Sequence, residues 1–154
     1  WMLDDAAHSV GDTGRKDNIK VWGFWNILGE EAFGRPSEEE IRPWYWAWSL
    51  MCRYFPKGCD INAVELTGSG ELRACAAESD GRHTVAVVNW SSEDVQISMQ
   101  VPYTFLNASV YVYEESGAYR DTEGGLVPSY TGICGDAVSV NVPAQSLTVI
   151  TDMQ

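Results

Sequence analysis

The hydrophobic pattern of this chain changes near residue 60, and the change limits which folds are open to it. Before that point aromatic residues are crowded together: of seven Trp, all but Trp90 lie within the first 48 positions. After that point apolar and polar residues alternate, with turn residues about every eight to twelve positions, which is typical of an antiparallel β-sandwich. Because 154 residues make one ordinary domain, we expect the aromatic part to pack against something larger.

The alternating part predicts about eight strands separated by short turns. Sequences such as Gly68-Ser69-Gly70 and Ser79-Asp80-Gly81 are typical turn sequences. The run Thr84-Val85-Ala86-Val87-Val88 is predicted to be a central strand. The predicted strands are 63–66, 72–77, 83–89, 95–101, 109–113, 126–130, 137–142 and 147–151.

The aromatic part predicts a strand that is buried on both sides. Residues 1–18 are polar and rich in Gly, which favours a loop. The run Val21-Trp22-Gly23-Phe24-Trp25-Asn26 then places apolar residues on both faces of a strand. Such a strand is typical of a parallel sheet covered by helices.

A helix is predicted after this strand. Ser37 and Glu40 fit a capping box, and the apolar residues of 43–55 cover most of the surface of a helix that Pro56-Lys57-Gly58 ends. We therefore expect residues 1–58 to hold the loop, the strand and the Trp-rich helix as the end of a barrel domain. Residues 59–154 form the C-terminal sandwich, so the fold class is mainly β.

Charge and composition exclude several functions. The formal net charge of −12 argues against nucleic acid, which needs a basic surface. No apolar stretch approaches the roughly 20 residues of a membrane span, so we expect a soluble protein without a membrane partner. His8 and His83 are far apart in sequence, and no Gly-rich loop has the residues of a nucleotide site. We therefore expect no cofactor and no metal.

The four cysteines leave the redox state open. Cys52, Cys59, Cys75 and Cys134 allow three complete pairings, whereas buried free thiols are the simpler interpretation. Asn89-Trp90-Ser91 and Asn107-Ala108-Ser109 match the glycosylation acceptor pattern. An extracellular or periplasmic location is our expectation.

The order of these elements resembles the C-terminal region of a clan A glycoside hydrolase. In such enzymes the last strand and helix of a (β/α)8 barrel are followed by a small β-sandwich. Here Val21-Trp22-Gly23-Phe24-Trp25-Asn26 corresponds to the strand, 44–55 to the helix, and Thr84-Val85-Ala86-Val87-Val88-Asn89 through Val149-Ile150 to the sandwich. The resemblance is one of architecture and covers nearly the whole chain.

The resemblance also implies where a sugar site lies. Active sites of barrels lie at the C-terminal ends of the strands, where Trp25 and Asn26 would be found, with Trp22 as a second aromatic candidate. Asp4 is a weak match to a catalytic carboxylate, because the resembled nucleophile is a Glu, and Glu30 could line a cleft. The acid/base partner has no counterpart here, so the chain alone is expected to be inactive.

Three functions remain open from the sequence. The chain is the C-terminal part of a glycosidase that acts on a polysaccharide or oligosaccharide. Or it is a stand-alone sandwich that binds glycan through exposed aromatics such as Trp90, Tyr103, Tyr119 or Tyr130, of which Trp90 is the best candidate. Alternatively, the sandwich is a packing domain that braces an upstream catalytic barrel and touches no ligand. The Trp-rich surface could also form a homodimer.

Overall fold

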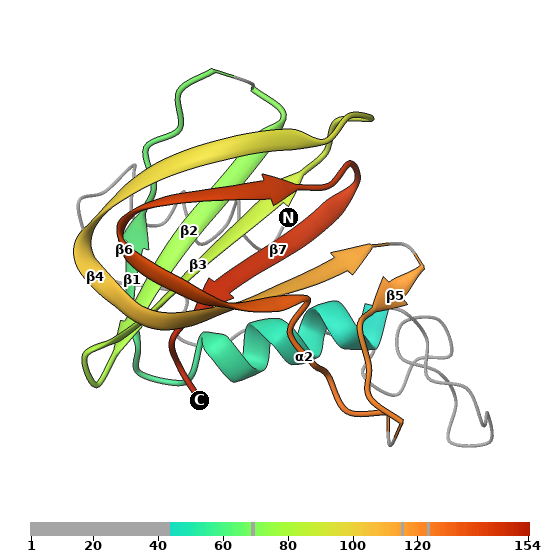
Figure 1. Ribbon diagram of the computed structural model, residues 1–154, viewed down its shortest axis with the longest axis horizontal. Coiled ribbons are helices and arrows are strands. Elements are labelled where there is room, and N and C mark those ends of the chain that lie inside the picture. The colour runs from blue at the N-terminus through green and yellow to red at the C-terminus, as the bar shows by residue number, and fades with distance from the viewer. Residues whose placement is uncertain (1–43, 69, 115, 123) are drawn as a thin grey trace.

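The computed structural model describes residues 44–154, apart from positions 69, 115 and 123. Helix α2 (Trp44–Tyr54) comes first, and the strands follow it (Figure 1). The strands are β1 (Asp60–Ala63), β2 (Leu72–Ser79), β3 (Arg82–Asn89), β4 (Val95–Glu114), β5 (Gly117–Ala118), β6 (Tyr130–Val142) and β7 (Ser146–Thr151).

Helix α2 confirms the helix expected over 43–55. Arg53 is its single charged residue. The helix ends before Pro56, which cannot donate a backbone hydrogen bond. Gly58 then adopts a left-handed φ of 88°, and the Cys59 N–H donates to the Pro56 carbonyl at 3.1 Å. This turn directs the chain into β1.

The described strands form one antiparallel sheet in the order β1-β2-β3-β7-β4-β5, and β6 pairs with β4. β3 lies between β2 and β7, which confirms that residues 84–88 are in a central strand. The last strand of the chain, β7, is inserted between β3 and β4 and is buried along its whole length. The C-terminal strand therefore joins the two parts of the sheet.

The sheet folds over itself along β4 and β6. The pairing of these strands shifts register between Gln100 and Phe105 and again before Ser109, and β4 curls around the molecule in Figure 1. Gly135, opposite Phe105, has a φ of 103°, a value that a side chain rarely allows. This bend places the first half of β4 and the second half of β6 in a layer that packs against the central strands.

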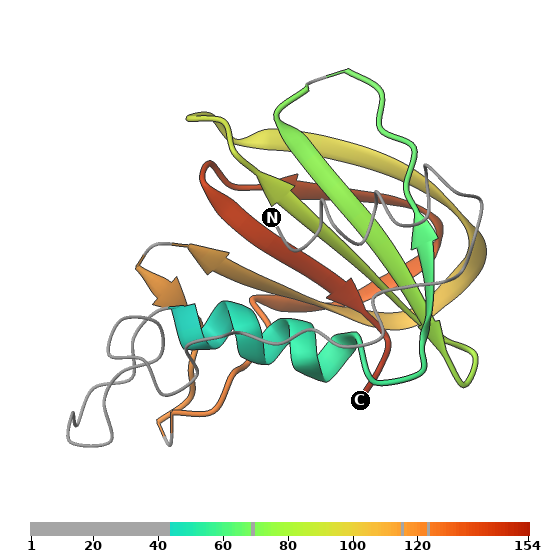
Figure 2. The ribbon, with the colours of Figure 1, turned by 180° about the vertical axis from the view of Figure 1, so that it is seen from behind.

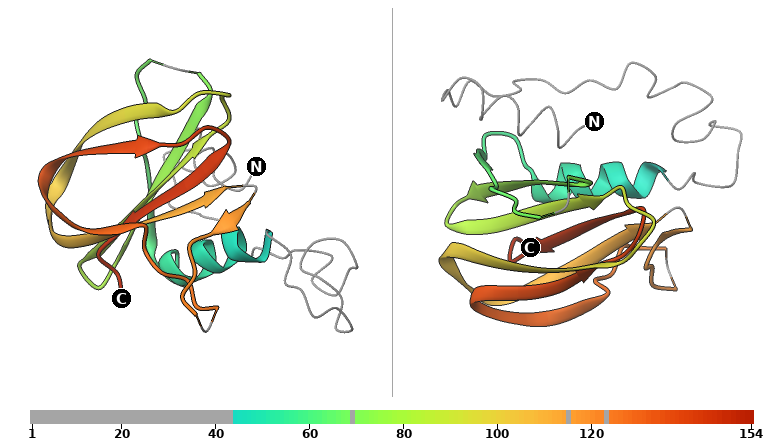
Figure 3. Two further views of the ribbon diagram at one scale, coloured as in Figure 1. Left: turned by 45° about the vertical axis from the view of Figure 1, so that its right-hand side comes forward. Right: turned by 90° about the horizontal axis from the view of Figure 1, so that it is seen from above.

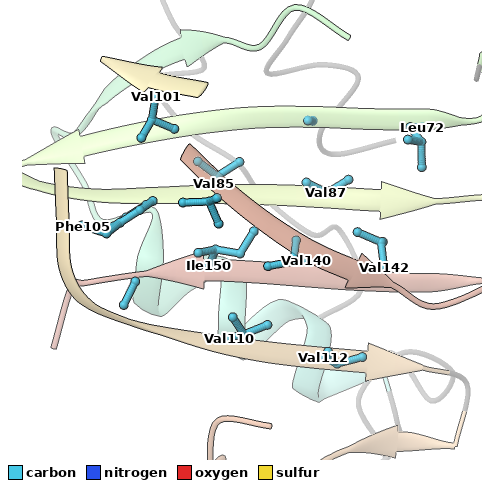
Figure 4. Close-up of a cluster of buried hydrophobic side chains, with 13 residues drawn as sticks. Leu72, Val85, Val87, Val101, Phe105, Val110, Val112, Val140, Val142 and Ile150 are labelled. Carbon is cyan, nitrogen blue, oxygen red and sulfur yellow. The ribbon is translucent and has the colours of Figure 1, made fainter. Parts of the chain in front are cut away.

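A hydrophobic core fills the space between the two layers of strands. Phe105, Val110, Val140, Val142 and Ile150 are at most 1% exposed. Figure 4 shows that their side chains converge with those of β2 and β3. Helix α2 covers the opposite face of the sheet, as seen from behind in Figure 2 and from above in Figure 3. The central strands are thus buried on both faces.

The predicted fold class is confirmed, since the structure is mainly antiparallel β with a helix before the strands. Seven strands are described instead of about eight. The predicted strands 95–101 and 109–113 form one strand, β4, and the predicted strand 126–130 is mostly loop, with an isolated bridge from Leu126 to Arg120. β1 ends where the strand 63–66 was expected to begin. The predicted Trp-rich strand lies outside the described residues.

The four thiols are free in this structure. Cys75 is fully buried on β2, and burial raises the pKa of its thiol to about 12. Cys59 is half-buried. Cys52 and Cys134 are exposed, so the expectation of buried thiols was wrong for these two.

Candidate functional site

Of the predicted site residues, the structure describes only Trp90. Asp4, Trp22, Trp25, Asn26 and Glu30 lie outside the described residues, so their roles stay predictions. Trp90 comes directly after β3, at the end of the sheet where the turns after β3 and β6 meet. Its side chain is 52% exposed.

The backbone of Trp90 is held from two sides. Its N–H donates to the carbonyl of Glu71, which precedes β2, at 3.0 Å. Its own carbonyl accepts a hydrogen bond from Gln145 Nε2. Gln145 lies in the β6–β7 turn and also donates to the Ser91 carbonyl, from its backbone N at 3.1 Å and from Nε2 at 3.0 Å. Two separate turns therefore fix the position of Trp90.

Asn89 links these turns through hydrogen bonds of its buried side chain. It is 1% exposed, and its Nδ2 donates to the carbonyls of Glu93, Val142 and Pro143 at 2.8 to 3.1 Å. Its Oδ1 accepts from the backbone N and the hydroxyl of Ser91. Because this amide is buried and fully used, the Asn89-Trp90-Ser91 acceptor pattern is not accessible for glycosylation in the folded protein.

The turn that follows Trp90 is polar and acidic. Ser92, Glu93 and Asp94 are exposed there. Asp94 accepts from the backbone N of Ala144 at 2.9 Å and from Asn141 Nδ2 at 3.3 Å. These two hydrogen bonds lower the pKa of its carboxyl. We call Trp90 with Ser91, Ser92, Glu93, Asp94 and Gln145 the Trp90 corner.

The other aromatic candidates for a binding sandwich lie elsewhere. Tyr103 is half-buried, with its ring stacked on His83 at a centroid distance of 3.6 Å. Burial, with the negative charges of Asp152 and Glu78, raises the pKa of Tyr103 to about 12. This ring is part of the packing. Tyr119 and Tyr130 are 61% and 43% exposed, near β5 and at the start of β6.

Helix α2 has two apolar faces. Trp46, Ala47, Leu50 and Tyr54 are buried, and the Tyr54 ring packs against Tyr111 of β4 at 5.0 Å between centroids. A second group, Tyr45, Trp48 and Cys52, follows helical spacing on the opposite side and is exposed or half-buried. We call this group the outer stripe of α2.

The N-terminal end of α2 is tied to the loop after β5. The Arg120 guanidinium lies over the Trp46 ring, 5.1 Å from its centroid. The loop itself is closed by hydrogen bonds between Asp121 and Gly125. This contact and the packing of Leu50 fix the orientation of the outer stripe relative to the sheet.

Within the described part of the chain, no three His, Cys, Asp or Glu side chains are grouped so that they could hold a metal ion. In that same part, no helix has the length and apolarity that crossing a membrane requires.

Neither a protein-family model nor a curated protein matches this sequence. Solved structures do match the fold. A GH30 endoxylanase from Clostridium papyrosolvens C71 aligns with a TM-score of 0.60 and 13% identity, over 74% of this chain and 28% of that chain. The family 30 subfamily 8 xylanase Xyn30A from Clostridium acetobutylicum aligns at 0.59 and 14% identity, over 73% of this chain and 28% of that one.

A third structure gives the same result. The catalytic domain of GH30 xylanase C from Talaromyces cellulolyticus aligns with a TM-score of 0.53 and 16% identity, over 73% of this chain and 24% of that chain. At these identities the likeness is one of fold alone. This chain spans about a quarter of the length of the glycoside hydrolase structures that it matches.

Sequence reasoning missed the residues that support the Trp90 corner. Gln145 adopts a positive φ of 50°, which is uncommon for a residue with a side chain, and no sequence signal marks it. Asn89 did carry a signal, because it ends an apolar strand at a position that continues the buried pattern of Thr84-Val85-Ala86-Val87-Val88.

Proposed function

We propose that this chain is the C-terminal part of a glycoside hydrolase. In this proposal the sandwich is an accessory domain that braces an upstream catalytic barrel, and the chain alone does not catalyse. The likeness in fold to a quarter of several glycoside hydrolase chains supports the proposal. The substrate of the whole enzyme would be a polysaccharide or oligosaccharide.

The two-faced helix is the observation that carries the proposal. A helix at the surface of a finished domain presents charged and polar residues to water. Here one face of α2 packs on the sheet, while the outer stripe carries Tyr45, Trp48 and Cys52. Arg53 is the one charge on the helix, and it does not belong to the stripe. The outer stripe therefore suits a helix placed between the sandwich and another apolar layer.

The occupant that we propose for the outer stripe is the barrel that would precede this helix in the chain. In that arrangement α2 is the last barrel helix, and Trp25 and Asn26 lie at the end of the last barrel strand beside the sugar. A second copy of the chain, packed through the same stripe, is the competing arrangement. It would make the protein a homodimer of sandwiches.

The first test is the reading frame upstream of Trp1. We expect it to encode about 200 or more further residues in which strands alternate with helices, as a barrel requires. A start codon and a signal peptide immediately before Trp1 would overturn the proposal and favour a stand-alone module.

The second test uses the extended protein and compares Trp48→Gln with Tyr119→Gln. Trp48 belongs to the outer stripe, whereas Tyr119 is an exposed aromatic near β5. We expect Trp48→Gln to lower the melting temperature of the extended protein more than that of residues 1–154, while Tyr119→Gln changes neither appreciably. Equal effects of Trp48→Gln in both proteins would show that nothing upstream packs on the stripe.

A further inference from the structure

The Trp90 indole makes neither a ring contact nor a hydrogen bond with the part of the chain that the structure describes. Among the described residues, no ring stacks on it and no oxygen accepts a hydrogen bond from its Nε1, although half of its surface is exposed. A Trp that fills a core is buried, and its N–H finds a partner there. Trp90 does neither, so packing of the sandwich does not account for its position.

The backbone beneath the indole is nevertheless fixed. Glu71 and Gln145, from two different turns, bond the N–H and the carbonyl of Trp90, and the buried Asn89 anchors the turn that follows. A ring on a fixed backbone loses less conformational freedom when a ligand binds. The corner therefore presents a large flat apolar surface from a rigid support.

The turn that follows Trp90 indicates the class of ligand. A protein hot spot is surrounded by contacts that exclude water, whereas Trp90 is followed in the same turn by Ser92, Glu93 and Asp94, all exposed. Hydroxyl and carboxylate groups in the same turn as an exposed aromatic ring match a sugar, whose C–H face can stack while its hydroxyls donate and accept hydrogen bonds. The acidic turn and the net charge of −12 repel an anionic polymer.

We propose that the Trp90 corner is a binding site for neutral polysaccharide, with the indole as its stacking platform. A sugar ring lies on the exposed face of Trp90, and its hydroxyls contact the Ser92, Glu93 and Asp94 side chains. The site belongs to the sandwich itself. It goes beyond the bracing role, and it holds whether or not a barrel precedes the chain.

Affinity electrophoresis of residues 1–154 in native gels tests this site with two polymers on the same backbone. We expect hydroxyethyl cellulose, which is neutral, to retard the parent chain, and carboxymethyl cellulose, which is anionic, to retard it less. Trp90→Ala should lose the retardation in hydroxyethyl cellulose, while Trp90→Tyr keeps part of it. Arabinoxylan, a second neutral polymer, extends the test to another sugar.

Tyr119→Ala is the matched control, because Tyr119 is a still more exposed aromatic outside the corner. It should be retarded like the parent, and circular dichroism should show that both Ala variants are folded. The proposal is wrong if no neutral polymer retards the parent, or if folded Trp90→Ala is retarded equally. A loss of self-association on Trp90→Ala without any retardation of the parent would overturn it in favour of a protein contact.

Discussion

At the scale of single residues, Asn89 is the polar group on which most of one end of the sandwich depends. Buried polar groups are tolerated when they are fully hydrogen-bonded, and they cost free energy when they lose their partners. The amide of Asn89 satisfies three carbonyls from two turns and accepts twice from Ser91. It therefore links β3 to the turn after β6.

We expect Asn89→Ala to lower the free energy of unfolding by about 1–3 kcal/mol, because the carbonyls of Val142 and Pro143 lose their donor inside the protein. Urea denaturation followed by circular dichroism measures this difference. Asn107→Ala on β4 is the control, since Asn107 is exposed and a surface substitution usually changes stability by at most about 0.5 kcal/mol. Equal effects of the two substitutions would contradict the role given to Asn89.

At the scale of elements, the ends of β3 and β7 are locked by a reciprocal pair of hydrogen bonds. The His83 N–H donates to Asp152 Oδ1 at 2.7 Å, and the Asp152 N–H donates to the His83 carbonyl at 3.1 Å. Thr84 and Thr151 add a buried contact of 2.7 Å between their hydroxyls. This pair closes the sheet beside the C-terminus.

Asp152→Ala removes the side-chain acceptor and is expected to cost about 1–2 kcal/mol of unfolding free energy. Hydrogen exchange should show the loss first at the amides of His83 and the end of β7. Asp152→Asn keeps an oxygen in the same place, so it should retain more stability than Asp152→Ala. If Asn were as damaging as Ala, the hydrogen bond to the His83 N–H would not be the cause.

The sequence predicted elements well where one local rule decided the outcome. The period of 3.6 in 44–54 and the apolar run of β3 each agree with the structure, because burial on a helix face or in a central strand leaves a regular pattern. The predicted strands 95–101 and 109–113 leave out the middle of β4, which contains Pro102, a residue type that normally ends pairing. The structure keeps the strand continuous, because Pro102 lies in the gap of β4–β6 pairing between Gln100 and Phe105, where its missing N–H costs little.

The candidate site could be predicted only in part for a related reason. Trp90 stands out in the sequence as an aromatic directly after a strand, and its exposure is a local property. The contact with Gln145 joins residues that are 55 positions apart, and it depends on how the β6–β7 turn meets the end of β3. The residue pattern of neither segment predicts this contact.

At the scale of the whole molecule, α2 and the sheet pack together in one hydrophobic cluster, although the predicted boundary after residue 58 separates them. Leu50 is fully buried among residues that include Ala86 of β3 and Val149 of β7. The boundary expected after residue 58 marks a change of secondary structure, whereas the packing across it is continuous. A helix held by such contacts should open together with the strands beneath it.

Hydrogen exchange with mass spectrometry can test this coupling in the complete chain. We expect peptides from α2 and from β3 to report similar opening free energies. Leu50→Ala should lower both by about 2–4 kcal/mol through the cavity that it leaves, while Ser49→Ala, half-buried on the same helix, should lower both by much less. If Leu50→Ala loosened α2 and left β3 unchanged, the helix would be a separate unit, and the sandwich would derive no stability from it.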